Sequence, residues 1–167
     1  MSYPEPVYFG ESGEASGIFR SVDRAPELVY LSGTAQGHYL ATGSLTRGRF
    51  GLYRWEMPGP RSGPGPHFHR TMSESFYVLS GAMRLYDGTR WVDAQPGDYF
   101  FFPEGGIHGF RNESDEPASM LILFAPGGPR EEYFEGLAEF QRSGQPTKED
   151  LADFYLRHDN ILVEEAG

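Results

Sequence analysis

The sequence predicts an all-β domain, a sandwich or a barrel, that is followed by a short helical tail. First, 22 Gly and 13 Pro make up about a fifth of the 167 residues, a share typical of chains with many turns. Second, the chain holds 13 Phe, 10 Tyr and 2 Trp, whereas disordered chains hold few aromatic residues. Third, short alternating runs separated by Gly, Pro, Asp and Asn fill residues 27–125, and many short strands give this pattern.

Ten short runs in this segment are expected to be strands. Turn sequences separate several of them, including Asp87-Gly88, Gln-Pro-Gly-Asp at 95–98 and Glu-Gly-Gly at 104–106. The expected strands are Leu28–Leu31, Tyr39–Gly43, Arg49–Met57, His67–Arg70, Glu74–Ser80, Met83–Tyr86, Arg90–Asp93, Tyr99–Pro103, His108–Asn112 and Ala118–Ala125.

The two ends of the chain differ from this β segment. The first 25 residues are polar and rich in Gly and Ser, and we interpret them as a loose arm or as a strand that pairs with a neighbouring chain. Apolar residues recur at helical spacing over Pro129–Gln141, and this helix is expected to cover an open end of the β domain or to gate it. A second helix is expected over Lys148–Leu156, with Thr147 as its N-cap and Asp150 in the capping box. The expected organisation is an arm at 1–25, a β domain at 26–126 and a helical tail at 127–167.

Charge and composition exclude several classes of protein. With 24 acidic and 14 basic residues the net charge is −10, which repels phosphate backbones, so nucleic acid is not an expected partner. The absence of cysteine excludes disulfides, zinc ribbons and thiolate nucleophiles. The apolar run Met120–Ala125 is far shorter than the roughly 20 residues that span a bilayer, so no membrane association is expected. Residues 1–5 lack the basic start of a signal peptide, and we expect a cytoplasmic protein.

Two histidines separated by one residue carry the strongest chemical signal. Side chains two residues apart on a strand project from the same face, about 7 Å apart, so His67 and His69 can converge on one ion. Glu74 is expected to share an inward strand face with Phe76, where a carboxylate is costly unless it is paired or bound to a metal. His108 opens a later strand. Each residue alone has an ordinary structural explanation, but together they indicate a metal site.

Two stretches resemble the signature motifs of the cupin superfamily. They read His67-x-His69-x4-Glu74-x6-Gly81 and Gly97-x5-Pro103-x-Gly105-x2-His108-x3-Asn112, with 15 residues between Gly81 and Gly97. This short spacer is similar to that of small single-domain bacterial cupins. One position departs from the pattern, because Arg61 stands where the first motif has a glycine. The Pro126-Gly127-Gly128 stretch before the aromatic helix is similar to the quercetin-dioxygenase-like cupins.

The resemblance implies a single cupin jelly-roll β-barrel that binds one divalent transition-metal ion. The implied ligands are His67, His69, Glu74 and His108. Imidazole and carboxylate ligands suit Fe, Mn, Co, Ni, Cu or Zn, and the residue types do not decide among these metals. The superfamily also implies a homodimer, in which the arm can pair across a two-fold axis.

Three functions are compatible with this site. The leading hypothesis is a dioxygenase acting on a small aromatic or enolic compound, with Glu74 as the catalytic residue that accepts a hydroxyl proton, provided that the apolar pocket raises its pKa. The second is a non-oxidative isomerase, cyclase or lyase, and the third is a non-catalytic protein that binds a metal and a small ligand. The side chains expected to contact the substrate, or else to fill the barrel core, are Tyr53, Trp55, Phe76 and Phe110.

Overall fold

The structure is a computed structural model that describes residues 2–31, 33, 35–59, 62–144 and 146–165. Position 61, where the first motif departs from its pattern, lies outside the described residues. The strands are β1 (Leu28–Val29), β2 (Gln36–Ala41), β3 (Gly51–Met57), β4 (His67–Phe68), β5 (Ser73–Ser80), β6 (Met83–Tyr86), β7 (Trp91–Ala94), β8 (Tyr99–Phe102), β9 (Gly109–Arg111), β10 (Ala118–Ala125) and β11 (Ile161–Leu162), and the helices are α1 (Arg130–Ser143) and α2 (Lys148–Arg157).

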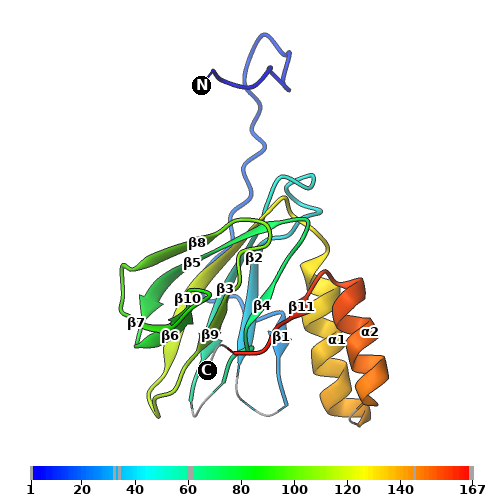
Figure 1. The fold of residues 1–167 in the computed structure, drawn as a ribbon. Helices are drawn as coiled ribbons and strands as arrows, with labels where there is room; N and C mark the ends of the chain where they lie inside the picture. Colours follow the sequence, from blue (N-terminus) through cyan, green and yellow to red (C-terminus); the bar gives the residue numbers. More distant parts are fainter. Residues whose placement is uncertain (1, 32, 34, 60–61, 145, 166–167) are drawn as a thin grey trace.

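The strands form two facing layers, with the helices beside them (Figure 1). The larger layer is a six-stranded sheet in the order β1-β2-β3-β10-β5-β8. The opposite layer contains the three-stranded sheet β7-β6-β9 and the pair β11-β4. An antiparallel bridge between His67 and His108 links β4 to the segment before β9. This arrangement confirms the predicted all-β jelly roll with two C-terminal helices.

Alternating burial along the central strands explains why these residues form a sandwich. Along β3 and β10 every second side chain is buried, so that one face of each strand packs against the core. Tyr53 of β3 lies opposite Ile122 of β10 in the antiparallel register, and both side chains are almost completely buried. On β5, Glu74 and Phe76 are buried while Tyr77 is exposed. Glu74 therefore lies on the apolar face, as the strand pattern predicts.

The strand boundaries differ from the predicted ones by a few residues, and one strand was not predicted. β2 begins three residues before the expected Tyr39 and ends before Gly43. β11 pairs with β4, with Ile161 opposite Phe68. Two residues are too short to show an alternating pattern, which is why the sequence does not reveal this strand. The predicted cap of α2 is confirmed, because the Thr147 side chain accepts a hydrogen bond from the Asp150 backbone.

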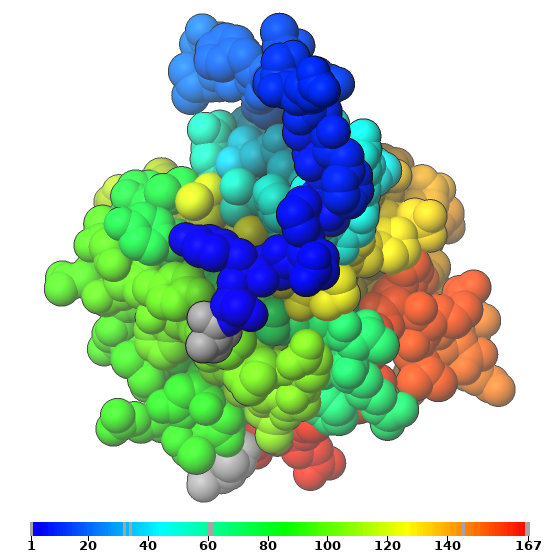
Figure 2. All heavy atoms as spheres, turned by 90° about the horizontal axis from the view of Figure 1, so that it is seen from above, coloured from blue at the N-terminus to red at the C-terminus, as the bar shows by residue number. Residues whose placement is uncertain are grey.

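The N-terminal residues extend away from the sheets. Residues 2–27 contain no helix or strand, and Figure 1 shows them projecting beyond the end of the domain. Seen from above, they cross the domain as a narrow strip of atoms (Figure 2). Apolar side chains such as Phe9 and Phe19 are exposed there. The expected pairing of this arm with a second copy stays a prediction. Within the described part of the chain, neither helix is long and apolar enough to cross a bilayer.

The glycine that ends the first motif provides a test of the packing between β5 and β10. Gly81 has φ +71°, and a Cβ atom there would lie 2.3 Å from the Pro117 carbonyl oxygen. Gly48 has a similar φ of +77° with open space around it. We expect Gly48→Ala to cost about 1–2 kcal/mol for the backbone conformation alone. Gly81→Ala should cost about 1–3 kcal/mol more because of the clash. Equal losses in chemical denaturation would contradict this packing.

Candidate metal centre

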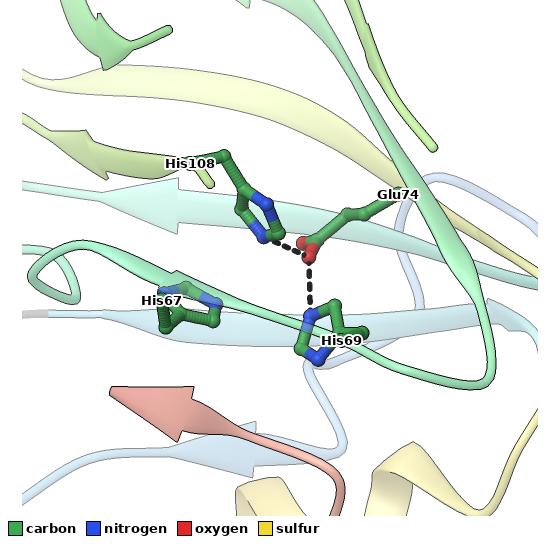
Figure 3. A group of neighbouring side chains, drawn as sticks. All are labelled: His67, His69, Glu74 and His108. Carbon is green, nitrogen blue, oxygen red and sulfur yellow. Dashed lines mark hydrogen bonds and ion pairs between the residues drawn. The ribbon is translucent and has the colours of Figure 1, made fainter. Parts of the chain in front are cut away.

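The structure brings together the four residues that the motifs single out. His67 lies on β4, His69 just after it, Glu74 on β5 and His108 just before β9. All four are buried, and one ligand atom from each lies within 4.8 Å of the others. Figure 3 shows the three imidazoles and the carboxylate directed toward one another between the two layers.

Backbone pairing explains why the histidines meet. His67 and His108 exchange two backbone hydrogen bonds, of 2.8 and 2.9 Å, which places their rings side by side with centroids 4.4 Å apart. His69 follows on the same face, and its ring centroid lies 5.2 Å from that of His108. Glu74 reaches the cluster from the opposite layer, where its strand lies between β8 and β10.

Each imidazole is held by a backbone carbonyl. The Nδ1 atoms of His67, His69 and His108 contact the carbonyl oxygens of Gly65, Asp159 and Gly106. A carbonyl oxygen can only accept a hydrogen bond, so each Nδ1 carries a hydrogen. In a neutral imidazole with its hydrogen on Nδ1, Nε2 carries a lone pair. This is the tautomer in which Nε2 can bind a metal.

The carboxylate of Glu74 lies between two of these rings. Its Oε2 is 2.8 Å from Nε2 of His69 and 2.7 Å from Nε2 of His108, as the dashed lines in Figure 3 show. Burial alone would raise the pKa of Glu74, but the adjacent His108 and His69 rings hold it well below its usual range. The sequence-based expectation of a raised Glu74 pKa is therefore not met.

The same surroundings shift the pKa values of His67 and His108 in opposite directions. Burial, reinforced by the nearby His108, lowers the pKa of His67 to about 3, so that its ring is neutral near pH 7. Burial also acts to lower the pKa of His108, but the Glu74 carboxylate outweighs it and the pKa is raised. The Glu74 carboxylate can only accept, so its contacts with Nε2 of His69 and His108 are hydrogen bonds donated by the rings. If an ion replaces these protons, three imidazole nitrogens and one carboxylate converge on it, and these donors suit a divalent transition metal.

Asp159 in the C-terminal segment contacts His69 and the turn after it. The sequence did not predict this contact. The carbonyl oxygen of Asp159 receives the His69 Nδ1 hydrogen bond across 90 positions of sequence. The Asp159 carboxylate accepts hydrogen bonds from the backbone N–H groups of Arg70 and Thr71 and from the Thr71 hydroxyl. Asp159 has a left-handed φ of 52°. A local sequence pattern cannot show such a contact between distant residues.

A cavity of about 240 Å³ opens onto the cluster. His67 and Glu74 line it, together with Trp55 and Phe110, two of the expected substrate contacts. The structure places the other two, Tyr53 and Phe76, elsewhere in the core. Tyr53 donates a hydrogen bond to Glu131, and Phe76 packs with its ring centroid 5.4 Å from that of Phe110.

Helix α1 supplies one wall of this cavity. The sequence predicted that the helix covers an open end or face of the barrel, or gates access to the site, and in the structure several of its side chains line the cavity that His67 and Glu74 also line. The lining residues from α1 are Arg130, Tyr133, Phe134, Leu137 and Gln141. Their helical spacing was recognisable in the sequence, whereas the surface that they face was not.

The two-layered jelly roll and its buried three-His, one-Glu cluster define a cupin-like fold and site. Residues 53–124, less than half of the chain, match the family described as the cupin domain, and the chain resembles the cupins over this segment. It is 24% identical over 121 residues to quercetin 2,3-dioxygenase of Bacillus subtilis, an alignment covering 72% of this chain and 32% of that enzyme.

Solved structures share the fold. One is described as a "predicted oxalate decarboxylase" from Thermotoga maritima, with TM-score 0.57, 23% identity and coverage of 66% of this chain and 99% of that chain. An RmlC-like cupin from Shewanella frigidimarina has TM-score 0.57 and 19% identity, with coverage of 71% and 96%. At these identities the likeness concerns the fold alone. The chain spans between 31% and 50% of the length of the three curated relatives that it matches.

The hydrogen bonds of Asp159 predict that a substitution outside the four-residue cluster lowers the affinity for a metal ion. In Asp159→Ala the carboxylate is lost and φ 52° becomes unfavourable, so the carbonyl that holds His69 is expected to move. We expect the affinity for Zn(II) to fall about 10–100-fold, measured by titration against a competing chelator. Asp159→Asn is the matched control, since asparagine tolerates this backbone conformation and keeps one acceptor oxygen. An unchanged affinity in Asp159→Ala would show that Asp159 does not position His69.

Proposed function

We propose that this protein is a metal-dependent dioxygenase that acts on a small aromatic or enolic compound. The observation that carries the proposal is that the cavity reaches the four-residue cluster, because His67 and Glu74 line the cavity and belong to the cluster. A compound in the cavity can therefore contact an ion held by the cluster. The similarity to the Bacillus subtilis quercetin 2,3-dioxygenase supports this reaction class.

We propose that the Nε2 atoms of His67, His69 and His108 and the carboxylate of Glu74 hold one divalent transition-metal ion. When bound, the ion supplies Lewis-acid and redox chemistry toward the substrate oxygen and O2. The chain's own residues bind and orient the compound and handle its proton.

Glu74 is the proposed proton acceptor. It lines the cavity and belongs to the cluster, and a carboxylate accepts protons well only from an acidic group. Enol and catechol hydroxyls are more acidic than those of alcohols. The Glu74 environment therefore favours an enolic or phenolic substrate.

The cavity walls restrict the size and shape of that substrate. Its volume of about 240 Å³ is below the roughly 300–1,000 Å³ of pockets that take drug-sized ligands. Trp55 and Phe134 line it with ring centroids 4.9 Å apart and an interplanar angle of 49°. A single-ring compound fits such a space better than a three-ring flavonol.

The test measures substrate loss and O2 uptake together, with catechol, 3,4-dihydroxybenzoate and an enolised 1,3-diketone as probes. We expect at least one probe to be consumed in step with O2, and expect consumption to stop in anaerobic buffer. Equal turnover without O2 would overturn the dioxygenase proposal in favour of non-oxidative chemistry. Recovery of every probe unchanged in air would instead support a binding protein without turnover.

The variant Glu74→Gln tests the role of Glu74 as proton acceptor separately from its role in holding the ion. The amide keeps an oxygen for the ion but cannot hold the hydroxyl proton, so turnover per bound metal should fall about 10²–10⁴-fold. Metal content is measured on the same samples. Unchanged turnover per metal would remove Glu74 from the proton transfer.

A further inference from the structure

Arg130 places a positive charge against the cavity that adjoins the metal cluster. It is the first residue of α1, and only 4% of its surface is exposed. It lines the same cavity as His67 and Glu74. Arginine is almost never buried this completely unless it is paired, so the partners of its guanidinium indicate its role.

The contacts of this guanidinium are with uncharged groups. Nη1 donates a 2.8 Å hydrogen bond to the His158 carbonyl oxygen, and Nη2 donates one of 3.2 Å to Oδ1 of Asn160. The rings of Tyr133 and Phe124 have their centroids 4.3 and 4.8 Å from the guanidinium carbon. Nε is buried and has no hydrogen-bond partner. Among the ion pairs of the described residues, none includes Arg130.

The nearest acidic groups are engaged elsewhere. Glu74 and Asp159 influence Arg130 through space, but Glu74 contacts the rings of His69 and His108. The Asp159 carboxylate accepts hydrogen bonds from the turn that follows His69. Within the described ranges Arg130 therefore has no counter-ion of its own, although arginine keeps its charge in proteins.

The charge of the metal cluster adds to that of Arg130. A divalent ion held by three neutral imidazoles and one carboxylate retains a net positive charge, so both ionic groups at this cavity would then be cationic. The rest of the lining includes apolar side chains such as Trp55, Phe110 and Phe134. An aromatic compound with a negative group complements both the rings and the charges.

We propose that Arg130 binds a carboxylate of the substrate, which makes the substrate a single-ring aromatic or enolic carboxylic acid. The proposal rests on the proposed function for the reacting part of the molecule, but the carboxylate contact is independent of the reaction. A guanidinium matches a carboxylate with two parallel N–H donors, and Nη1 and Nη2 each carry a second N–H besides the one donated to the His158 and Asn160 oxygens. The ring would then lie against Trp55 and Phe134, with its hydroxyl end toward Glu74.

The test compares the binding of benzoate with that of benzamide, its uncharged analogue. The full chain is used as purified, without O2, in isothermal titration calorimetry. We expect wild-type protein to bind benzoate at least about tenfold more tightly, since hydrogen bonds to charged groups have this magnitude. Arg130→Met should lose the preference, and Arg130→Lys should keep part of it. Equal binding of the two probes by wild-type protein would overturn the proposal.

Two controls separate the carboxylate contact from other effects. Metal content is matched between wild type and variants, so a preference that survives unchanged in Arg130→Met would assign it to the metal and contradict the role of Arg130. Arg130 also joins α1 to residues 158–160, and both variants are expected to have a lower Tm. If Arg130→Met does not fold, Arg130→Lys at matched metal content decides: a benzoate preference equal to that of the wild type would contradict the role of Arg130, and a reduced one would support it.

Failure of the carboxylate proposal can be told apart from failure of the dioxygenase proposal. A benzoate preference that depends on Arg130, found together with turnover that does not need O2, would keep the carboxylate site and overturn the dioxygenase. Oxygen consumption without any benzoate preference would support the dioxygenase and overturn the carboxylate site.

Discussion

Three hydrogen bonds from imidazole Nδ1 atoms to backbone carbonyl oxygens determine how the four-residue cluster presents its ligand atoms. They fix the ring orientation of His67, His69 and His108 with Nδ1 on the carbonyl side, so that Nε2 of His69 and His108 faces Glu74. Two of the carbonyls, those of Gly65 and Gly106, lie two residues before the histidine that they hold. The ligand geometry is therefore built into the same turns that start β4 and β9, and it depends little on mobile side chains.

The third carbonyl comes from the C-terminal tail, and this makes the tail part of the site. Asp159 holds His69, β11 pairs with β4, and Arg130 joins the start of α1 to the segment around Asn160. The two layers and their turns supply the four cluster residues, while the tail supplies one cavity wall and its cationic group. The strands and their turns thus hold the four cluster residues, and the tail supplies the residues of the proposed carboxylate contact.

The sequence predicted the cluster because each of its members is marked locally. The one-residue spacing of His67 and His69 on a strand and the position of Glu74 on an apolar face can both be seen in short windows. The roles of Arg130 and Asp159 were not predictable in this way, because each depends on contacts with residues far away in sequence. Tyr53 is a similar case. The alternation along its strand predicts that the side chain faces inward, but it does not predict whether that side chain lies in the core or in the cavity.

The most direct test of this account is the metal content of the protein purified without added metal. Elemental analysis of the wild type should find close to one transition-metal ion per chain. The double variant His67→Ala/His108→Ala should be nearly metal-free, because loss of ligands severely weakens such a site. Circular dichroism checks that the variant keeps its β structure. Equal metal content in the two proteins, or a wild type that binds no transition metal even when one is supplied, would contradict the central claim.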